Sequence, residues 1–167
     1  MFEEIHETAV SVISNVFETM LFTFLEPQDG EEGRDPSALH SSAVWLRGEI
    51  GFSGKYSGTL RLTLTLRLAR RMASNFMGLE EDESSESQAV DLVNELCNMV
   101  CGNLSCRLER ALMWKIAIPR TQVLSHPEPE DGATRPEISV DFDADGERVN
   151  LSIQLSSATP VPVGPPS

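Results

Sequence analysis

The sequence predicts an α+β fold in which two long helices and a shorter one pack on one face of an antiparallel sheet of about five or six strands. Two long stretches place apolar residues at three- and four-residue intervals, which is the pattern of amphipathic helices. Several shorter stretches alternate apolar and polar residues, as strands with one wet face do. The 167 residues fit a single domain, expected over residues 1–157, and the Pro-rich end over 158–167 is expected to be disordered.

Composition narrows the classes of function. Thirteen Lys and Arg against twenty-six Asp and Glu give a formal net charge of −13, which repels the phosphate backbone of nucleic acids. No apolar run approaches the roughly 18–20 residues that span a bilayer, and the acidic start MFEEIHETAV lacks the basic region of a secretory signal. We therefore expect a cytoplasmic protein that binds neither nucleic acid nor membrane.

The first helix is predicted over Glu3–Leu25 by a single apolar stripe. The residues of this stripe are Ile5, Ala9, Val12, Ile13, Val16, Met20 and Phe24. Pro27 cannot continue a helix because its nitrogen carries no hydrogen. The acidic, turn-rich stretch QDGEEGRDPSALHSS that follows is therefore predicted to be a loop.

Two strands are predicted between Ala43 and Leu68. The second is the clearer, because leucines at positions 60, 62, 64, 66 and 68 alternate with Arg or Thr. Glycines at positions 48, 51, 54 and 58 lie around the junction, where the chain turns or two backbones approach closely. The next stretch, LARRMASNFMG, is predicted to be a short helix that ends at Gly78.

A second long helix is predicted over about Ser87–Met113, after the charged loop LEEDESSES. Ser85, with Gln88 three residues later, has the pattern of a capping box at its start. Three cysteines, at positions 97, 101 and 106, fall on this helix. Their odd number and the lack of a Cys-x-x-Cys pair favour small apolar helix residues over a zinc site.

Three further strands are predicted beyond Pro119, in TQVLS, ISVDF and RVNLSIQL. Between the last two, DFDADGE matches the first half of a calcium-binding loop, but Ser152 stands where that loop needs a bidentate Glu. An Asp-Gly hairpin turn explains the same residues without a metal ion. We expect the hairpin and no metal site.

At about 100° per residue, the helix over 87–113 has two distinct faces. The apolar face consists of Val93, Leu96, Cys97, Val100, Leu104, Leu108 and Ala111. The opposite face consists of Asp91, Asn94, Glu95, Asn98, Gly102, Ser105 and Glu109. Glu95 and Asn98 are three residues apart, so a carboxylate and an amide project side by side. On periodicity alone, a merely solvated face explains this pattern better than a site does.

Residue types on the polar face suggest more than solvation. Asn is a middling helix former and Gly costs about 1 kcal/mol relative to Ala in a helix interior. Asn98, Gly102 and Asn103 are therefore poor choices if the helix needed only to be stable. A glycine one turn after the pair leaves a notch that the backbone of another protein can approach.

The stretch AVDLVNELCNMVCGNLSCRL, which contains the pair, resembles the signature of the CheC, CheX and FliY family of chemotaxis phosphatases. That signature has an Asp or Ser, three residues, a Glu, two residues, an Asn, and a Pro some twenty residues later. Asp91, Glu95, Asn98 and Pro119 fill these places, and Glu-Leu-x-Asn-Met-Val-x-Gly-Asn matches CheX-like members closely. The stretch GFSGKYSGTLRLTLTLRLARRMASNFMG resembles the family's strand-strand-helix segment, so the likeness covers roughly residues 1–157.

This resemblance implies a phosphatase that acts on a phosphorylated CheY-like response regulator. It implies that Asn98 positions the attacking water and that Glu95 pairs with the active-site Lys of the regulator. The regulator supplies Mg²⁺, so the chain is expected to need no cofactor of its own. Asp91, Asn94 and Gly102 are expected to contact the partner. Because CheX-like relatives pair across a sheet edge, a homodimer is expected as well.

In this family each of two related long helices can carry a site. In the first helix Ser14 and Glu18 match the pattern, but Leu21 stands in the place of the Asn. The resemblance therefore implies one active site, on the second long helix.

Two other interpretations remain. His6, His40 and His126 are scattered, and no Ser-His-Asp or Cys-His signature supports a stand-alone hydrolase. A non-catalytic CheX-like module, which dimerises or docks on a signalling partner through the same helix, is the serious competitor, because a fold does not prove turnover.

Overall fold

The computed structural model describes residues 2–28, 43–80, 83–109, 114–127 and 135–156. Their helices and strands are α1 (Phe2–Leu21), β1 (Glu26–Gln28), β2 (Trp45–Ser53), β3 (Gly58–Thr65), α2 (Leu66–Met77), α3 (Glu86–Leu108), β4 (Lys115–Ile116), β5 (Arg120–Leu124), β6 (Ile138–Ala144) and β7 (Glu147–Leu155). The tail predicted over 158–167 lies outside the described residues.

The described strands form one antiparallel sheet of seven strands in the order β1-β6-β7-β3-β2-β4, with β5 also paired to β2. The predicted α+β class is confirmed, and the number of strands exceeds the expected five or six because β1 and β4 are very short. Strands of two or three residues carry too little alternation to be recognised in a sequence.

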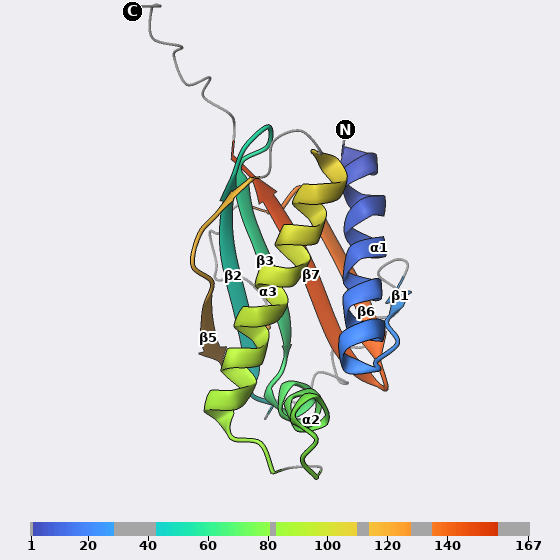
Figure 1. The fold of residues 1–167 in the computed structure, drawn as a ribbon, viewed down its shortest axis with the longest axis vertical. Helices are drawn as coiled ribbons and strands as arrows, with labels where there is room; N and C mark the ends of the chain where they lie inside the picture. The colour runs from blue at the N-terminus through green and yellow to red at the C-terminus, as the bar shows by residue number, and fades with distance from the viewer. Residues whose placement is uncertain (1, 29–42, 81–82, 110–113, 128–134, 157–167) are drawn as a thin grey trace, which may run out of the picture.

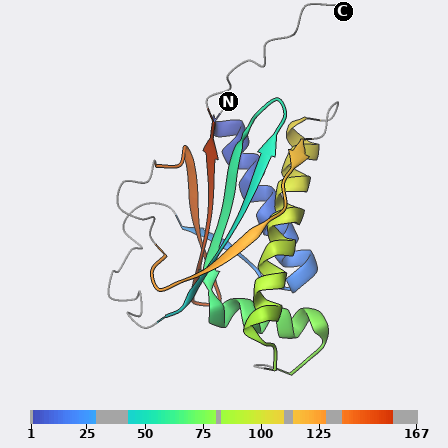
Figure 2. The ribbon, with the colours of Figure 1, turned by 90° about the vertical axis from the view of Figure 1, so that its left-hand side faces the viewer.

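The two long helices lie side by side and antiparallel on one face of the sheet (Figure 1). The shorter helix α2 crosses one end of the sheet, between the lower ends of α1 and α3 (Figures 1 and 2). It contacts both long helices as well as β2 and β3. The helices therefore lie on one side of the sheet as expected, but α2 closes an end and does not form part of the layer above its face.

Strand alternation divides the sheet into a dry face and a wet face. Leucines 60, 62 and 64 of β3 are fully buried beneath the helices. On the other face, Arg61 forms an ion pair with Glu49 on β2, with 2.7 Å between Nε and Oε2. Asp141 and Arg148 pair in the same way between β6 and β7. The core therefore lies between the sheet and the two long helices.

The boundary between β3 and α2 differs from the prediction. Leu66 and Leu68 continue the period-two pattern, yet they belong to α2. The Thr65 hydroxyl accepts a hydrogen bond from the Leu68 backbone N–H at 3.1 Å and so caps the helix. Gly78 ends α2 in the left-handed region at φ 68°, as predicted.

Helix α1 ends at Leu21, four residues before the predicted end. Phe22 adopts a positive φ of 51°, which cannot continue a right-handed helix. The Thr23 N–H then donates to the Phe17 carbonyl at 3.0 Å. The apolar stripe predicted to extend to Phe24 therefore stops at Leu21, and Phe24 is exposed.

The hairpin predicted at DFDADGE is confirmed. Asp145 and Gly146 both have positive φ, 51° and 85°, as a type I′ turn requires. The Gly146 N–H donates to the Asp143 carboxylate at 3.2 Å. Asp143 thus serves the turn that joins β6 to β7.

Candidate functional site

Helix α3 begins with the predicted capping box. The Ser85 hydroxyl accepts from the Gln88 N–H at 3.1 Å, and the Gln88 side chain accepts from the Ser85 N–H at 2.8 Å. The apolar stripe is buried as expected from Val93 to Leu104, whereas Leu108 is only partly buried. Ala111 lies outside the described residues.

A glycine of the sheet determines how closely α3 approaches β2. A Cβ atom added at Gly48 would lie 2.5 Å from Cys97 Sγ and 2.7 Å from Val93 Cγ1. Real Cβ atoms do not tolerate such distances, so only glycine allows the helix to pack this closely. The close packing fixes the depth and the rotation of α3, and with them the direction of its outer face.

The outer face of α3 presents the predicted pair to solvent. Asp91, Glu95 and Asn98 are exposed, and Gly102 is partly exposed. Within the described part of the chain, the structure records no hydrogen bond to the side chains of Glu95 and Asn98. A Cβ added at Gly102 would meet no atom within 4 Å, so this position is open. A carboxylate, an amide and a notch therefore lie together on a surface that another protein can reach.

Asn94 differs from its neighbours. Its side-chain Oδ1 accepts a hydrogen bond of 2.7 Å from the Thr121 hydroxyl on β5, and the residue is only partly exposed. Asn94 therefore joins α3 to the edge of the sheet. A contact between Asn94 and a partner stays a prediction. Because Oδ1 already accepts from Thr121, the amide nitrogen is the end of the Asn94 side chain that can make this contact.

The end of α3 corrects two positions that were predicted to lie on the polar face. Ser105 is fully buried, and its hydroxyl accepts from the Trp114 N–H at 2.8 Å. Glu109 is partly buried, and its Oε2 accepts from the Trp114 indole Nε1–H and from the Lys55 N–H, both at 3.0 Å. The segment around Trp114, which stacks on Phe52 at 4.5 Å between ring centroids, covers this last turn.

Helix α1 repeats the burial pattern of α3. Buried residues of α1 and α3 coincide at an offset of 80, which matches residues 9, 12, 13, 16, 17 and 21 with residues 89, 92, 93, 96, 97 and 101. In that register Asn15 corresponds to Glu95 and Glu18 to Asn98, so the amide and the carboxylate occur in reverse order. The register predicted from Ser14, Glu18 and Leu21 is out of phase with burial, because Leu21 points into the core. A single site, on α3, stays a prediction.

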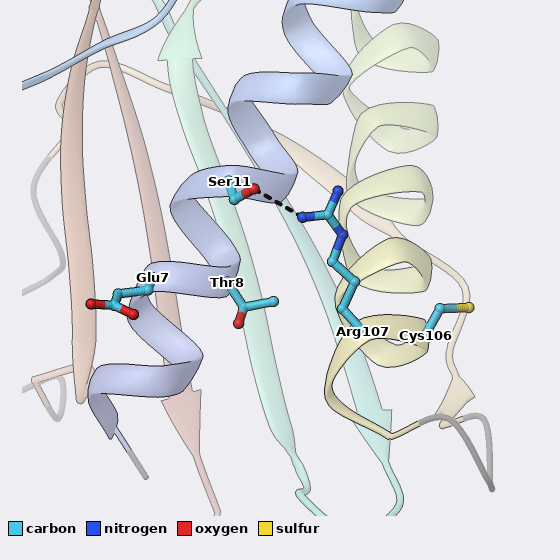
Figure 3. A pocket seen from close by; sticks show the side chains of 5 residues that line it. All are labelled: Glu7, Thr8, Ser11, Cys106 and Arg107. Carbon is cyan, nitrogen blue, oxygen red and sulfur yellow. Dashed lines mark hydrogen bonds between the residues drawn. The ribbon is translucent and has the colours of Figure 1, made fainter.

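A shallow, open depression lies between α1 and α3, toward the end of α3 (Figure 3). It is lined by Glu7, Thr8, Ser11, Cys106 and Arg107. Arg107 reaches across to α1 and donates to the Ser11 hydroxyl at 2.9 Å. The Glu7 carboxylate and the Cys106 thiol point away from one another, so these groups do not converge on a common point (Figure 3).

Two of the three cysteines, Cys97 and Cys101, are buried as expected of small apolar helix residues, whereas Cys106 is exposed. Burial raises the pKa of both Cys97 and Cys101 to about 12. Both thiols therefore stay protonated at neutral pH, whereas a nucleophile or metal ligand must be a thiolate. Nor do any three His, Cys, Asp or Glu residues of the described segments gather as metal ligands would.

Comparison with known proteins extends these observations. Residues 47–143 match the family model described as Chemotaxis phosphatase CheX. No curated protein matches the sequence. Among the described helices, none is long and apolar enough to cross a membrane.

Several solved structures share the fold. The chemotaxis protein CheX of Vibrio vulnificus has a TM-score of 0.70 and 22% identity, over 93% of this chain and 99% of that one. CheX from the CheX-CheY-BeF3-Mg²⁺ complex of Borrelia burgdorferi has a TM-score of 0.65 and 19% identity, over 89% and 96%. FliY of Thermotoga maritima is more distant, with a TM-score of 0.59 and 14% identity over 92% and 87%. Because the family model spans more than half of its residues, this chain belongs to the CheX family of chemotaxis phosphatases.

Proposed function

We propose that this chain removes the phosphoryl group from the aspartyl-phosphate of a CheY-like response regulator, with Glu95 and Asn98 entering the phosphorylated site. The observation that carries this proposal is the exposed pair on α3, where an amide and a carboxylate stand together without an intramolecular hydrogen bond from the described residues. The family and the relative solved in complex with CheY support the choice of partner.

Asn98 can position water without being consumed. Its side-chain oxygen accepts a hydrogen bond from a water molecule and its amide nitrogen donates one, so both ends orient the nucleophile. The water oxygen forms a bond to phosphorus while the bond to the aspartyl oxygen breaks, which yields inorganic phosphate and a free Asp carboxylate. The Mg²⁺ and Lys of the regulator neutralise the transferred group, and the enzyme contributes proximity and orientation.

Glu95 is proposed to pair with that Lys. A charge-assisted hydrogen bond between them fixes the position of α3 relative to the phosphoryl group. Asp91 lies one turn before Glu95, and Asn94 lies one turn before Asn98. From these positions Asp91 and the amide nitrogen of Asn94 can contact the rim of the regulator's site. Gly102 lies one turn later, and its open position admits backbone from the partner. Neither Glu95 nor Asn98 forms a covalent intermediate in this scheme.

Substitution of Asn98 by Ala tests the proposal. We expect the rate of phosphate release from the phosphorylated regulator to fall by at least about 100-fold, because positioning of the nucleophile is lost, while binding of the regulator is retained. Glu95→Ala is expected to weaken both binding and turnover. Asn103→Ala is the matched control, because Asn103 is an exposed amide on the same helix whose side chain donates to the Met99 carbonyl.

A single-turnover assay also separates the phosphatase from a docking module. A chain that binds the phosphorylated regulator but leaves its phosphoryl lifetime unchanged is a docking module. Full activity of Asn98→Ala would show that the amide does not position the water.

We also propose that the chain forms a homodimer across a sheet edge. Within the described residues β5 pairs with β2 alone, so its outer edge is available for a strand of a second copy. Light scattering during size-exclusion chromatography measures the mass of the particle, and a monomer would refute the pairing.

A further inference from the structure

Large apolar side chains are exposed at one corner of the helix layer. We name this set the apolar corner and define it as Met20, Phe22 and Phe24 at the end of α1 with Phe76, Met77 and Leu79 at the end of α2. Phe22 and Phe24 are 84% and 71% exposed, which is unusual for side chains that gain so much by burial. Clusters of exposed apolar residues mark interaction sites more often than scattered single ones do.

The backbone holds Phe22 in this exposed position. Its φ of 51° lies in the left-handed region, which is strained for a bulky residue. Two hydrogen bonds maintain the turn, from the Thr23 N–H to the Phe17 carbonyl at 3.0 Å and from the Thr23 hydroxyl to the Leu21 carbonyl at 3.1 Å. Thr23 and Leu25 point inward and are buried, so Phe22 and Phe24 are turned outward by the same alternation.

The end of α2 supplies the other half of the apolar corner. Gly78 stops the helix in the left-handed conformation, and the Leu79 N–H donates to the Ser74 carbonyl at 2.8 Å. This cap fixes Met77 and Leu79 on either side of Gly78. Helix α2 contacts both α1 and α3, and Figure 1 shows it between their lower ends.

The apolar corner lies beside the first half of α3. Helices α1 and α3 run in opposite directions, so the end of α1 lies next to the early turns of α3 (Figure 1). Asp91 is exposed on these turns. It precedes Asn98 by seven residues (98 − 91), which is about 10 Å along a helix that rises about 1.5 Å per residue. The apolar corner and the proposed catalytic pair therefore belong to neighbouring parts of the helix layer.

From this arrangement we propose that the apolar corner is the second half of the docking surface for the phosphorylated receiver domain, beside the polar pair on α3. The inference rests on the proposed function and names where the substrate protein binds. In this arrangement α3 supplies the chemistry, whereas the ends of α1 and α2 supply the apolar contact area that holds the receiver in place.

The charge around the apolar corner favours a receiver domain over other binding partners. Glu18, Asp91 and Glu95 are exposed on the adjoining helix faces, and Glu80 and Glu83 follow Leu79. A second copy of the chain, packed through the same face, would bring these acids against their own counterparts. An anionic lipid surface would be repelled in the same way. A receiver presents its Lys and Mg²⁺ at the phosphorylated site, so it complements the acidic surroundings.

The test replaces Phe22 by Asn, which removes the ring and tolerates the left-handed backbone. Binding to a CheY-like receiver loaded with beryllofluoride and Mg²⁺ is measured by calorimetry. We expect the Kd to rise at least about tenfold, the KM for the phosphorylated receiver to rise with it, and kcat to stay near the wild-type value. The melting temperature is expected to stay constant or to rise, because a strained conformation is relieved. Phe24→Ser is expected to weaken binding in the same direction.

Phe2→Asn is the matched control. Phe2 is a phenylalanine at the start of α1 and is 48% exposed. The length of α1, about 28 Å at 1.5 Å per residue, separates Phe2 from the end of the helix that precedes Phe22. Substitution of Phe2 is expected to leave the Kd unchanged. This pair of variants separates the position of the ring from the loss of a ring in general.

Other outcomes would overturn the proposal. If the wild type dephosphorylates the receiver, and the Phe22→Asn and Phe24→Ser variants bind the receiver as tightly as the wild type does, the docking surface is wrong. The proposed function then stands. If the wild type neither binds nor dephosphorylates receivers, the proposed function fails and the docking proposal fails with it. A dimer that dissociates on Phe22→Asn would assign the corner to a second copy. A large drop in melting temperature would show that the chain itself covers Phe22.

Discussion

Gly102 allows the stability of α3 to be separated from its recognition of a partner. The residue lies in the interior of the helix, one turn after Asn98, and a Cβ added there would meet no atom within 4 Å. Gly102→Ala therefore adds a methyl group to open space and removes a flexible residue from a helix. In the isolated chain the substitution has a conformational benefit and no steric cost.

The expected gain in stability follows from helix propensity. Alanine is favoured over glycine in a helix interior by about 1 kcal/mol. For a chain of this length, that difference raises the melting temperature by roughly 2–4 °C. If the backbone of the receiver occupies the notch, the same methyl group overpacks the interface at a cost of about 1–3 kcal/mol, equivalent to a Kd weakened about fivefold or more.

Thermal and urea unfolding measure the first effect, and calorimetric titration with a beryllofluoride-loaded receiver measures the second. Gly48→Ala is the matched control. Its methyl group would lie 2.5 Å from Cys97 Sγ, so it is expected to lower the free energy of unfolding by about 1–3 kcal/mol. The same chemical change thus has opposite effects on stability at the two glycines.

Two results would refute the reasoning about Gly102. Destabilisation by Gly102→Ala would mean that the position is not open. A stabilised variant that binds and dephosphorylates the receiver as well as wild type would mean that no partner backbone enters the notch, and the glycine would then have no explanation in the interface.

Two further predictions concern the core of α3 and its last turn. Above pH 9 the free energy of unfolding is expected to fall until about pH 12, because unfolded Cys97 and Cys101 lose their protons near pH 9 while the folded thiols keep theirs up to a pKa of about 12. Urea unfolding across this range should show a shallower fall in a Cys97→Ala/Cys101→Ala variant, and equal slopes would contradict the assigned burial. Glu109→Ala is expected to lower the free energy of unfolding by about 1–3 kcal/mol, since it leaves the Trp114 indole without its acceptor. Urea unfolding should show a smaller loss for Glu109→Gln, which keeps an acceptor oxygen. Identical losses in the two variants would exclude this hydrogen bond as the cause.

Local patterns of the sequence were sufficient for much of the fold. The apolar stripe that includes Val93 and Val100 predicts the buried face of α3, because a helix of fixed period must bury one side. Ser85 and the Asp145–Gly146 pair predict a cap and a turn, since both depend on bonds within a few residues. The outward direction of Glu95 and Asn98 follows from the same period.

Contacts between distant segments decided the remaining features. Leu66 and Leu68 keep the alternation of a strand, yet the cap at Thr65 turns them into a helix. Ser105 has the period of a solvated face, but Trp114 folds back over it. Asn94 is equally outward by period, and a hydroxyl from β5 engages it.

The sequence by itself therefore determined the class of the fold and the outward direction of Glu95 and Asn98, because periodicity and capping are short-range effects. The chemistry proposed for this pair comes from the resemblance of its motif to a known family. Only the tertiary structure decided what surrounds that pair. The exposed aromatics after α1, the end of α2 beside them and the close approach of α3 to Gly48 depend on segments far apart in the chain. The physical reason is that the period of a helix determines which side avoids water, whereas the packing of the whole domain determines which residues lie next to the helix.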